Sequence, residues 1–146
     1  AYEISECLVD SEMCIRDRTN VKENNSSVKP VMADALEICE TFADGEFDLI
    51  VSNPPYIKSA DIETLQKEVR LEPRLALDGG EDGCDFYREI VSRWSRKLKK
   101  GGALAFELGE NQADAVKALM TDKGFSDFKI SLDFGGVQRA IIGTLL

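Results

Sequence analysis

The tetrapeptide Asn53-Pro54-Pro55-Tyr56 carries the clearest chemical signal in this chain. The side chain of Asn53 offers a carbonyl acceptor and an amide donor, and the Pro54 carbonyl has no N–H beside it to compete for a partner. Together these two acceptors could hold a flat NH2 group by both of its hydrogens, while the Tyr56 ring offers an aromatic surface to a planar amide or base. The pattern predicts a site for planar amino groups; the alternative is a structural Pro-Pro turn capped by an asparagine.

Residues 53–56, called the corner below, must be positioned by the short apolar run before them. Leu49, Ile50 and Val51 follow one another without a polar break, which is typical of a central parallel strand covered on both faces. The two prolines cannot donate to a sheet ladder and require extended backbone before them, so the chain must leave the sheet here. Ligands of open α/β sheets bind at the carboxyl ends of strands, and we therefore expect the corner to lie at such an edge.

The segments after the corner predict alternating helices and strands. We expect a mobile or partly helical lid over residues 57–70, a buried carboxylate at Glu72 that accepts backbone N–H bonds, and a turn at residues 79–83. A helix should begin at an Asp85 N-cap and end at Gly101-Gly102, with one apolar stripe of Tyr87, Ile90, Val91, Trp94 and Leu98. A buried strand over 103–107, a helix over 110–123, a half-buried strand over 128–134 and a last strand over 139–146 complete the pattern.

Several separated motifs resemble one family. Asn53-Pro54-Pro55-Tyr56 is similar to the NPPY signature of S-adenosylmethionine-dependent methyltransferases that act on planar NH2 nitrogens. The order and spacing of the further motifs resemble the PrmC/HemK family of protein-(glutamine-N5) methyltransferases; they are Glu72–Leu77, Gly79–Gly83, Glu107-Leu108-Gly109 with Gln112, and Asp133-Phe134-Gly135 with Arg139. The resemblance implies an α/β fold, a Rossmann-like class I methyltransferase sheet with a terminal antiparallel strand pair.

The same resemblance implies an activity and a set of site residues. Members transfer a methyl group from S-adenosylmethionine to the side-chain amide nitrogen of the GGQ glutamine of peptide chain release factors, which would be the protein partner. Asn53, Pro54, Pro55 and Tyr56 map onto the catalytic corner, and Asn53 also faces the cofactor. No metal and no covalent intermediate are expected.

Residues 28–34 predict a strand that ends at an acidic residue, with Pro30 indicating an edge position. By the resemblance, Asp34 and Ala35 would lie beside the adenine of the cofactor. Asp34 also has the right type for an N-cap of the following short helix, and the two interpretations are compatible.

The segment before Val28 lacks two expected parts of the cofactor site. The family's glycine-rich strand-to-helix turn and the acidic residue for the ribose have no counterpart there, and its N-terminal helical domain is missing too. We therefore expect residues 19–146 to be a C-terminal part of the catalytic domain, inactive by itself, with an exposed strand edge. Residues 1–18 resemble translated sequencing-adapter read-through and predict a non-native or disordered leader; a short, partly helical arm is the alternative.

Composition narrows the remaining choices. The formal net charge of −9 opposes binding to a phosphate backbone, and without histidine or a Cys-x-x-Cys pair a zinc site is not expected. Without an 18-residue apolar run or a secretory signal, the expectation is a cytoplasmic protein with no membrane association. Two alternatives stay open: an amino methyltransferase of nucleic acids such as an N6-adenine enzyme, and a non-catalytic binding domain without cofactor.

Overall fold

The computed structural model describes residues 12–146, which fall into two compact units divided after Thr41. The first unit contains α1 (Glu12–Glu23) and the four-residue α2 (Ala35–Ile38), followed by a 3-10 turn, Cys39–Thr41. α1 ends just before a polar segment at residues 24–27. Residues 12–18 of the predicted leader form the first turns of α1; residues 1–11 lie outside the described part, and a non-native origin stays a prediction.

The predicted strand over residues 28–34 is wrong. This segment runs without regular secondary structure from the end of α1 to α2. A strand needs a ladder partner, the described part of the first unit contains no strand, and Pro30 has no N–H to offer one.

The second unit, Phe42–Leu146, is built on a four-stranded mixed sheet. Its strands are β1 (Phe47–Ser52), β2 (Leu98–Glu107), β3 (Phe125–Leu132) and β4 (Gln138–Leu145), in the order β1-β2-β4-β3. β1 and β2 are parallel, and β4 is antiparallel to both β2 and β3. The expected terminal antiparallel pair is thereby confirmed.

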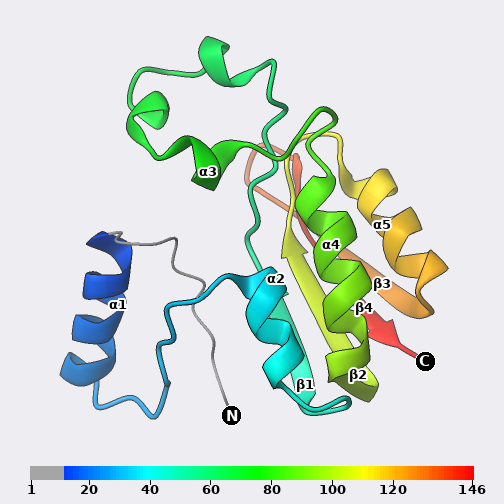
Figure 1. Cartoon of the computed structure of the whole chain (residues 1–146). Coiled ribbons are helices and arrows are strands. Elements are labelled where there is room, and N and C mark those ends of the chain that lie inside the picture. Colours follow the sequence, from blue (N-terminus) through cyan, green and yellow to red (C-terminus); the bar gives the residue numbers. More distant parts are fainter. Residues whose placement is uncertain (1–11) are drawn as a thin grey trace. The chain divides into compact units, whose positions relative to one another are not determined.

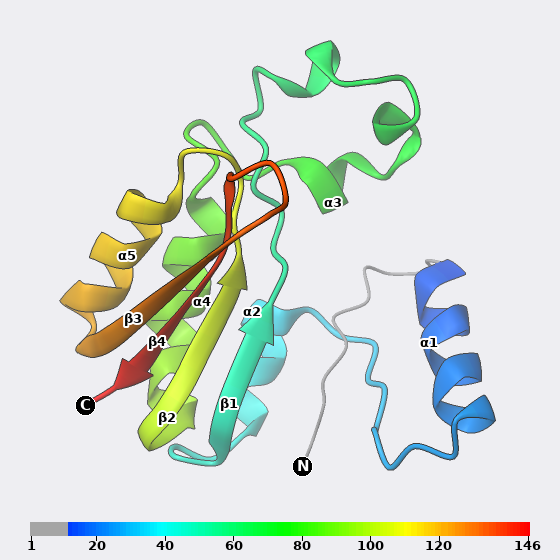
Figure 2. The ribbon, with the colours of Figure 1, turned by 180° about the vertical axis from the view of Figure 1, so that it is seen from behind.

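Two helices, α4 (Asp85–Trp94) and α5 (Ala113–Asp122), pack on one face of this sheet (Figures 1 and 2). The predicted stripe of α4 is buried, and the Tyr87 ring meets Phe106 of β2 edge-on with centroids 5.2 Å apart. From α5, Ala113, Val116 and Met120 are buried against the strands. These contacts form the core of the second unit and hold the carboxyl end of β2.

The prediction that β1 is covered on both faces is wrong. β1 pairs only with β2 among the described strands, and Leu49 and Val51 are 51% and 67% exposed. The two helices cover one face of the sheet, so alternate residues of β1 point to the face that they leave open. The exposed strand edge, by contrast, was expected.

The boundaries of α4 also differ from the prediction. Cys84 is the N-cap residue and Asp85 the first helical residue, whose carboxylate accepts from Arg88. The helix ends at Trp94, and β2 begins at Leu98, so Gly101-Gly102 lies within a strand. A 3-10 turn, Ser95–Lys97, lies between them, and the buried Lys97 donates through Nζ to the Phe42 carbonyl at 2.7 Å.

The remaining predicted elements are close to those observed. α5 lies within the expected segment, β4 begins and ends one residue earlier than expected, and β2 contains the predicted buried strand. β3 begins at Phe125 and ends at Leu132, so Phe134 lies beyond the strand, fully exposed at the tip of the hairpin.

Candidate active site

The tetrapeptide 53–56 leaves the sheet at the carboxyl end of β1, where Ser52 is paired with Phe106 of β2. Pro54 is buried, whereas Asn53 is exposed, and its side-chain amide makes no hydrogen bond within residues 12–146. The rigid part of the corner is thus held by the protein, and the polar part is presented outward. This arrangement suits a group that binds a ligand.

Tyr56 joins the ends of the two parallel strands. Its hydroxyl donates to Oε1 of Glu107, the last residue of β2, over 3.1 Å. Partial burial, and then the charge of Glu107, raise the pKa of the Tyr56 hydroxyl above its ordinary value of 10. Tyr56 therefore stays protonated at neutral pH and is suited to act through its ring face and not as a base.

The chain beyond Tyr56 forms a loop that closes at its base. Ile57 donates to the Leu77 carbonyl at 3.0 Å, and Gly79 donates back to the Ile57 carbonyl at 2.7 Å. Between these bonds lie two 3-10 turns, Ile62–Thr64 and Val69–Leu71, and α3 (Arg74–Leu77), so the partly helical segment is confirmed. The loop projects beyond the ends of β1 and β2 (Figure 1), and its role as a lid stays a prediction.

Asp78 fastens the base of this loop. Its Oδ1 accepts from the Ser59 hydroxyl at 2.5 Å and from the Gly80 N–H at 3.1 Å, and its Oδ2 accepts from Arg74 at 3.1 Å. These hydrogen bonds, that from Ser59 first, lower the pKa of Asp78. The prediction that Glu72 is a buried carboxylate supporting this loop is wrong, because Glu72 is exposed. Asp78, six residues later, accepts a backbone N–H, that of Gly80.

Gln112 is a buried polar residue whose role the sequence did not predict. It is only 7% exposed, and its side-chain Nε2 donates to the Tyr56 carbonyl at 2.9 Å and to the Gly83 carbonyl at 3.2 Å. Its spacing from Glu107-Leu108-Gly109 was noted as part of a motif, but a spacing along the chain does not reveal a contact with residue 56. A glutamine just before the first residue of an apolar helix was the available signal.

Asp34 and Ala35 lie in the first unit. Oδ1 of Asp34 accepts from the Leu36 N–H at 2.7 Å, so the N-cap interpretation of Asp34 is confirmed, and Ala35 is the first residue of α2. The corner lies in the second unit, and contact of Asp34 and Ala35 with a cofactor stays a prediction.

These residues fit S-adenosylmethionine in part. The Asp34 carboxylate is exposed and could accept from an adenine amino group, and Asn53 is exposed at the end of a parallel strand. The methionine end of the cofactor would require backbone N–H groups from a glycine-rich turn, yet the first glycine of the printed sequence is Gly45. The printed sequence therefore contains no glycine-rich turn before Asp34, and cofactor binding by Asp34, Ala35 and Asn53 stays a prediction.

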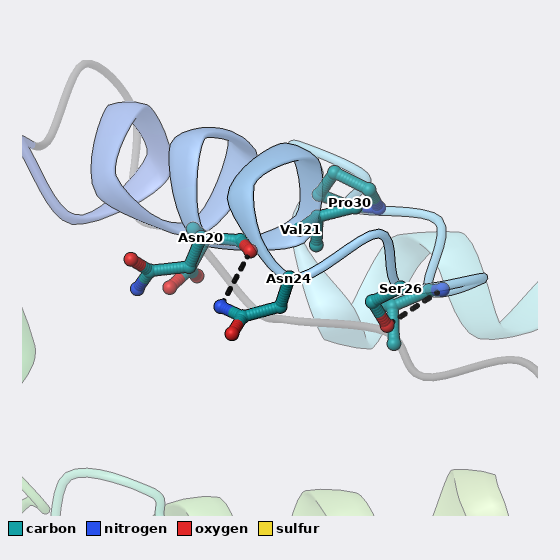
Figure 3. A pocket seen from close by; sticks show the side chains of 7 residues that line it. Asn20, Val21, Asn24, Ser26 and Pro30 are labelled. Atoms are coloured by element: carbon teal, nitrogen blue, oxygen red, sulfur yellow. Dashed lines mark hydrogen bonds between the residues drawn. The ribbon is translucent and has the colours of Figure 1, made fainter.

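A separate hollow of about 290 Å³ lies within the first unit (Figure 3). Its lining joins α1 to the segment that follows; the residues are Asp17, Asn20, Val21, Asn24, Ser26, Val28 and Pro30. In Figure 3 the Asn24 side chain turns back to donate to the Asn20 carbonyl at 2.8 Å. None of the predicted site residues lines this hollow.

Comparisons with known proteins identify relatives of this chain. A family model described as "Eco57I restriction-modification methylase" matches residues 5–106. The release factor glutamine methyltransferase of Geobacter sulfurreducens is 50% identical over 107 residues, which cover 73% of this chain and 38% of that protein. The chain thus spans about two fifths of the length of this curated relative.

Solved structures show the same fold. A methyltransferase from Pyrococcus furiosus has a TM-score of 0.68 at 24% identity, over 97% of this chain and 61% of that chain. A protein-(glutamine-N5) methyltransferase (release factor-specific) from Alicyclobacillus acidocaldarius has a TM-score of 0.52 at 22% identity, over 99% and 78%. The fold is that of class I S-adenosylmethionine-dependent methyltransferases.

Within that class, the chain belongs to the PrmC/HemK family of protein-(glutamine-N5) methyltransferases. No helix among residues 12–146 has the length and apolarity needed to cross a bilayer.

Proposed function

We propose that this chain supplies the amide-binding corner of an enzyme that methylates the side-chain amide nitrogen of the GGQ glutamine of peptide chain release factors. The observation that carries the proposal is the contrast within residues 53–56: Pro54 is buried and Tyr56 is anchored to Glu107, while Asn53 is exposed with an unengaged side-chain amide among the described residues. The 50% identity to the Geobacter release factor glutamine methyltransferase supports the same substrate class.

The corner residues would make a poor nucleophile reactive. An amide nitrogen has a delocalised lone pair, so it must be oriented and its developing positive charge stabilised. The Asn53 side-chain oxygen and the Pro54 carbonyl would accept its two hydrogens, and both acceptors become more favourable as charge develops on nitrogen. The Tyr56 ring would lie against the amide plane. S-adenosylmethionine, when bound, supplies an electrophilic methyl group.

The mechanism needs no ionisable base in the corner. The raised pKa of Tyr56 keeps its hydroxyl protonated and engaged with Glu107, so that residue fixes the ring and does not remove a proton. The proton of the methylated amide would leave to solvent after transfer. Positioning and electrostatic preorganisation are the contributions of these residues.

A nucleic-acid amino methyltransferase is the second candidate, because the matching family model carries the description of a restriction-modification methylase. The charge around the corner favours a protein substrate. Tyr56 lies within electrostatic reach of the carboxylates of Glu107 and Glu72 and of the Arg139 guanidinium, in a chain of net charge −9. Such surroundings repel a phosphate backbone.

A chimera tests the proposal. The 107 aligned residues of the Geobacter protein are replaced by those of this chain, and methyl transfer from labelled cofactor is measured with a release factor and with duplex DNA in the same reaction. Label should enter the release factor only; label in DNA would support the second candidate. A chimera that binds cofactor but labels neither substrate would support a non-catalytic binding domain.

Asn53→Ala in this chimera should lower kcat by about 10²–10³-fold, the usual effect of deleting one preorganised hydrogen-bonding group at a reacting centre. The matched control is Gln138→Ala, which removes an exposed side-chain amide at the first residue of β4. A rate within a few-fold of the parent for Asn53→Ala would contradict the role of Asn53. Since release factors act at the ribosome, we also expect a cytoplasmic location.

A further inference from the structure

The side-chain amide of Gln112 has a partner for every hydrogen and for its oxygen. Its Nε2 hydrogens go to the carbonyls of Tyr56 and Gly83, and its Oε1 accepts from the Gly109 N–H at 3.0 Å and from the Tyr87 hydroxyl at 3.3 Å. A buried amide with all its hydrogen bonds made has one orientation. Gln112 therefore has no capacity left to bind a ligand, and its contacts serve the protein.

The Tyr87 hydroxyl fixes the amide from behind. Tyr87 is fully buried in α4, and its single hydroxyl hydrogen is shared between Gln112 Oε1 at 3.3 Å and the Glu107 carbonyl at 2.8 Å. Burial is the largest of the effects that raise the pKa of this hydroxyl, so it stays a donor. Gln112 Oε1 is thus tied to α4 and to the end of β2.

The Gly83 backbone leaves room for this arrangement. Gly83 has a φ of +78°, and a Cβ on it would lie 2.5 Å from Gln112 Nε2 and 2.5 Å from the Tyr56 carbonyl oxygen. The close approach of three chain segments at this point requires the absence of a side chain. Tight packing and directed hydrogen bonds therefore act on the same atom, the Tyr56 carbonyl oxygen.

Tyr56 is consequently fixed at three places. Gln112 holds its carbonyl, the N–H of Ile57 in the same peptide plane donates to Leu77, and its hydroxyl donates to Glu107. At the other end of the corner, β1 is hydrogen-bonded to β2, and the two prolines between have fixed φ angles. The direction of the Pro54 carbonyl and the Asn53 backbone depends on these two fixed ends.

We propose that Gln112 is the positioning residue of the amide-binding corner, acting through the Tyr56 carbonyl to hold Asn53 and Pro54 in the geometry that accepts a planar NH2 group. The inference rests on the proposed function, because it assigns the corner an amide ligand. Gln112 itself touches neither substrate nor cofactor.

Amide binding by the full chain provides the test. A peptide containing Gly-Gly-Gln is titrated into the ¹⁵N-labelled protein, and the resonance of the Asn53 side-chain NH2 is followed. The control ligand is the same peptide with Gly-Gly-Glu in place of Gly-Gly-Gln. Gln112→Glu removes both donated hydrogen bonds while keeping the shape, and it should weaken binding at least tenfold. Gln138→Glu makes the same chemical change at an exposed site and should bind like the parent.

A dependence on pH separates positioning from general loss of structure. A buried carboxyl is protonated more readily than an exposed one, and the protonated carboxyl that Gln112→Glu introduces could again donate one hydrogen bond. Binding by Gln112→Glu, relative to Gln138→Glu, should therefore recover in part between pH 7 and pH 5. Equal affinity of the two variants at every pH would overturn the inference.

Two further readouts keep the outcomes separate. Tyr87→Phe removes one donor to Gln112 together with the hydrogen bond to the Glu107 carbonyl, and it should weaken binding a few-fold in the same direction. It decides the case if Gln112→Glu does not fold, and parent-like binding would then overturn the inference. Hydrogen exchange of the Ile57 N–H is measured without peptide. If the parent protein does not bind the peptide, the proposed function fails. In that case, faster exchange of the Ile57 N–H in the variants still supports positioning of the corner by Gln112. Unchanged exchange refutes that positioning role.

Discussion

Replacing Gly83 by alanine should destabilise the second unit by more than the same replacement at Gly101. Both glycines have a φ of +78°, so alanine incurs the same left-handed backbone strain of about 1–2 kcal/mol at each. A Cβ at Gly101 meets no atom within 4 Å, whereas a Cβ at Gly83 would lie 2.5 Å from both Gln112 Nε2 and the Tyr56 carbonyl oxygen. Overpacking of this kind costs about 1–3 kcal/mol more.

The difference between the two variants isolates this steric contribution, because the backbone strain cancels. Urea unfolding can be followed by the fluorescence of Trp94, the only tryptophan of the chain, which is buried in α4. We expect Gly83→Ala to be less stable than Gly101→Ala by about 1–3 kcal/mol. Free energies of unfolding that agree within about 0.5 kcal/mol would refute the close approach of Gly83, Gln112 and Tyr56.

Two further predictions concern ionisable groups at the candidate site. The pKa of Asp78 is lowered below 3.8, so its carboxylate should stabilise the loop base fully above pH 3.8. This stabilisation should be lost as the pH falls through the lower pKa of the folded state. The NMR chemical shift of the Gly80 amide should follow this titration, and Asp78→Asn should abolish the change. A Gly80 shift that titrates near 3.8 would contradict this. Tyr56→Phe should change the affinity for the amide ligand by no more than a few-fold, because the ring remains. The affinity of the parent protein should show no tyrosine-dependent change below pH 10. A large loss of affinity in Tyr56→Phe would instead assign a direct role to the hydrogen bond with Glu107.

Much of the sheet and helix content could be predicted because it depends on local patterns. The apolar stripe of α4, the antiparallel pair β3–β4 and the position of residues 53–56 directly after a strand all follow from side-chain periodicity and from the backbone restrictions of proline. The predictions that were wrong required knowledge of neighbours. The segment 28–34 has strand-like residues but no ladder partner among the described residues, and the contact of the Lys97 ammonium group with the Phe42 carbonyl joins residues 55 positions apart.

The sequence by itself determined the chemistry of the corner: an amide side chain, a carbonyl without a competing N–H, and an aromatic ring on a chain segment that prolines keep rigid. The tertiary structure decided what holds it. Gln112 reaches the Tyr56 carbonyl across 56 positions of sequence, and the Tyr56 hydroxyl reaches Glu107 across 51, because β1 and β2 end side by side. Hydrogen bonds between residues so far apart depend on strand order and helix packing, which no local pattern specifies.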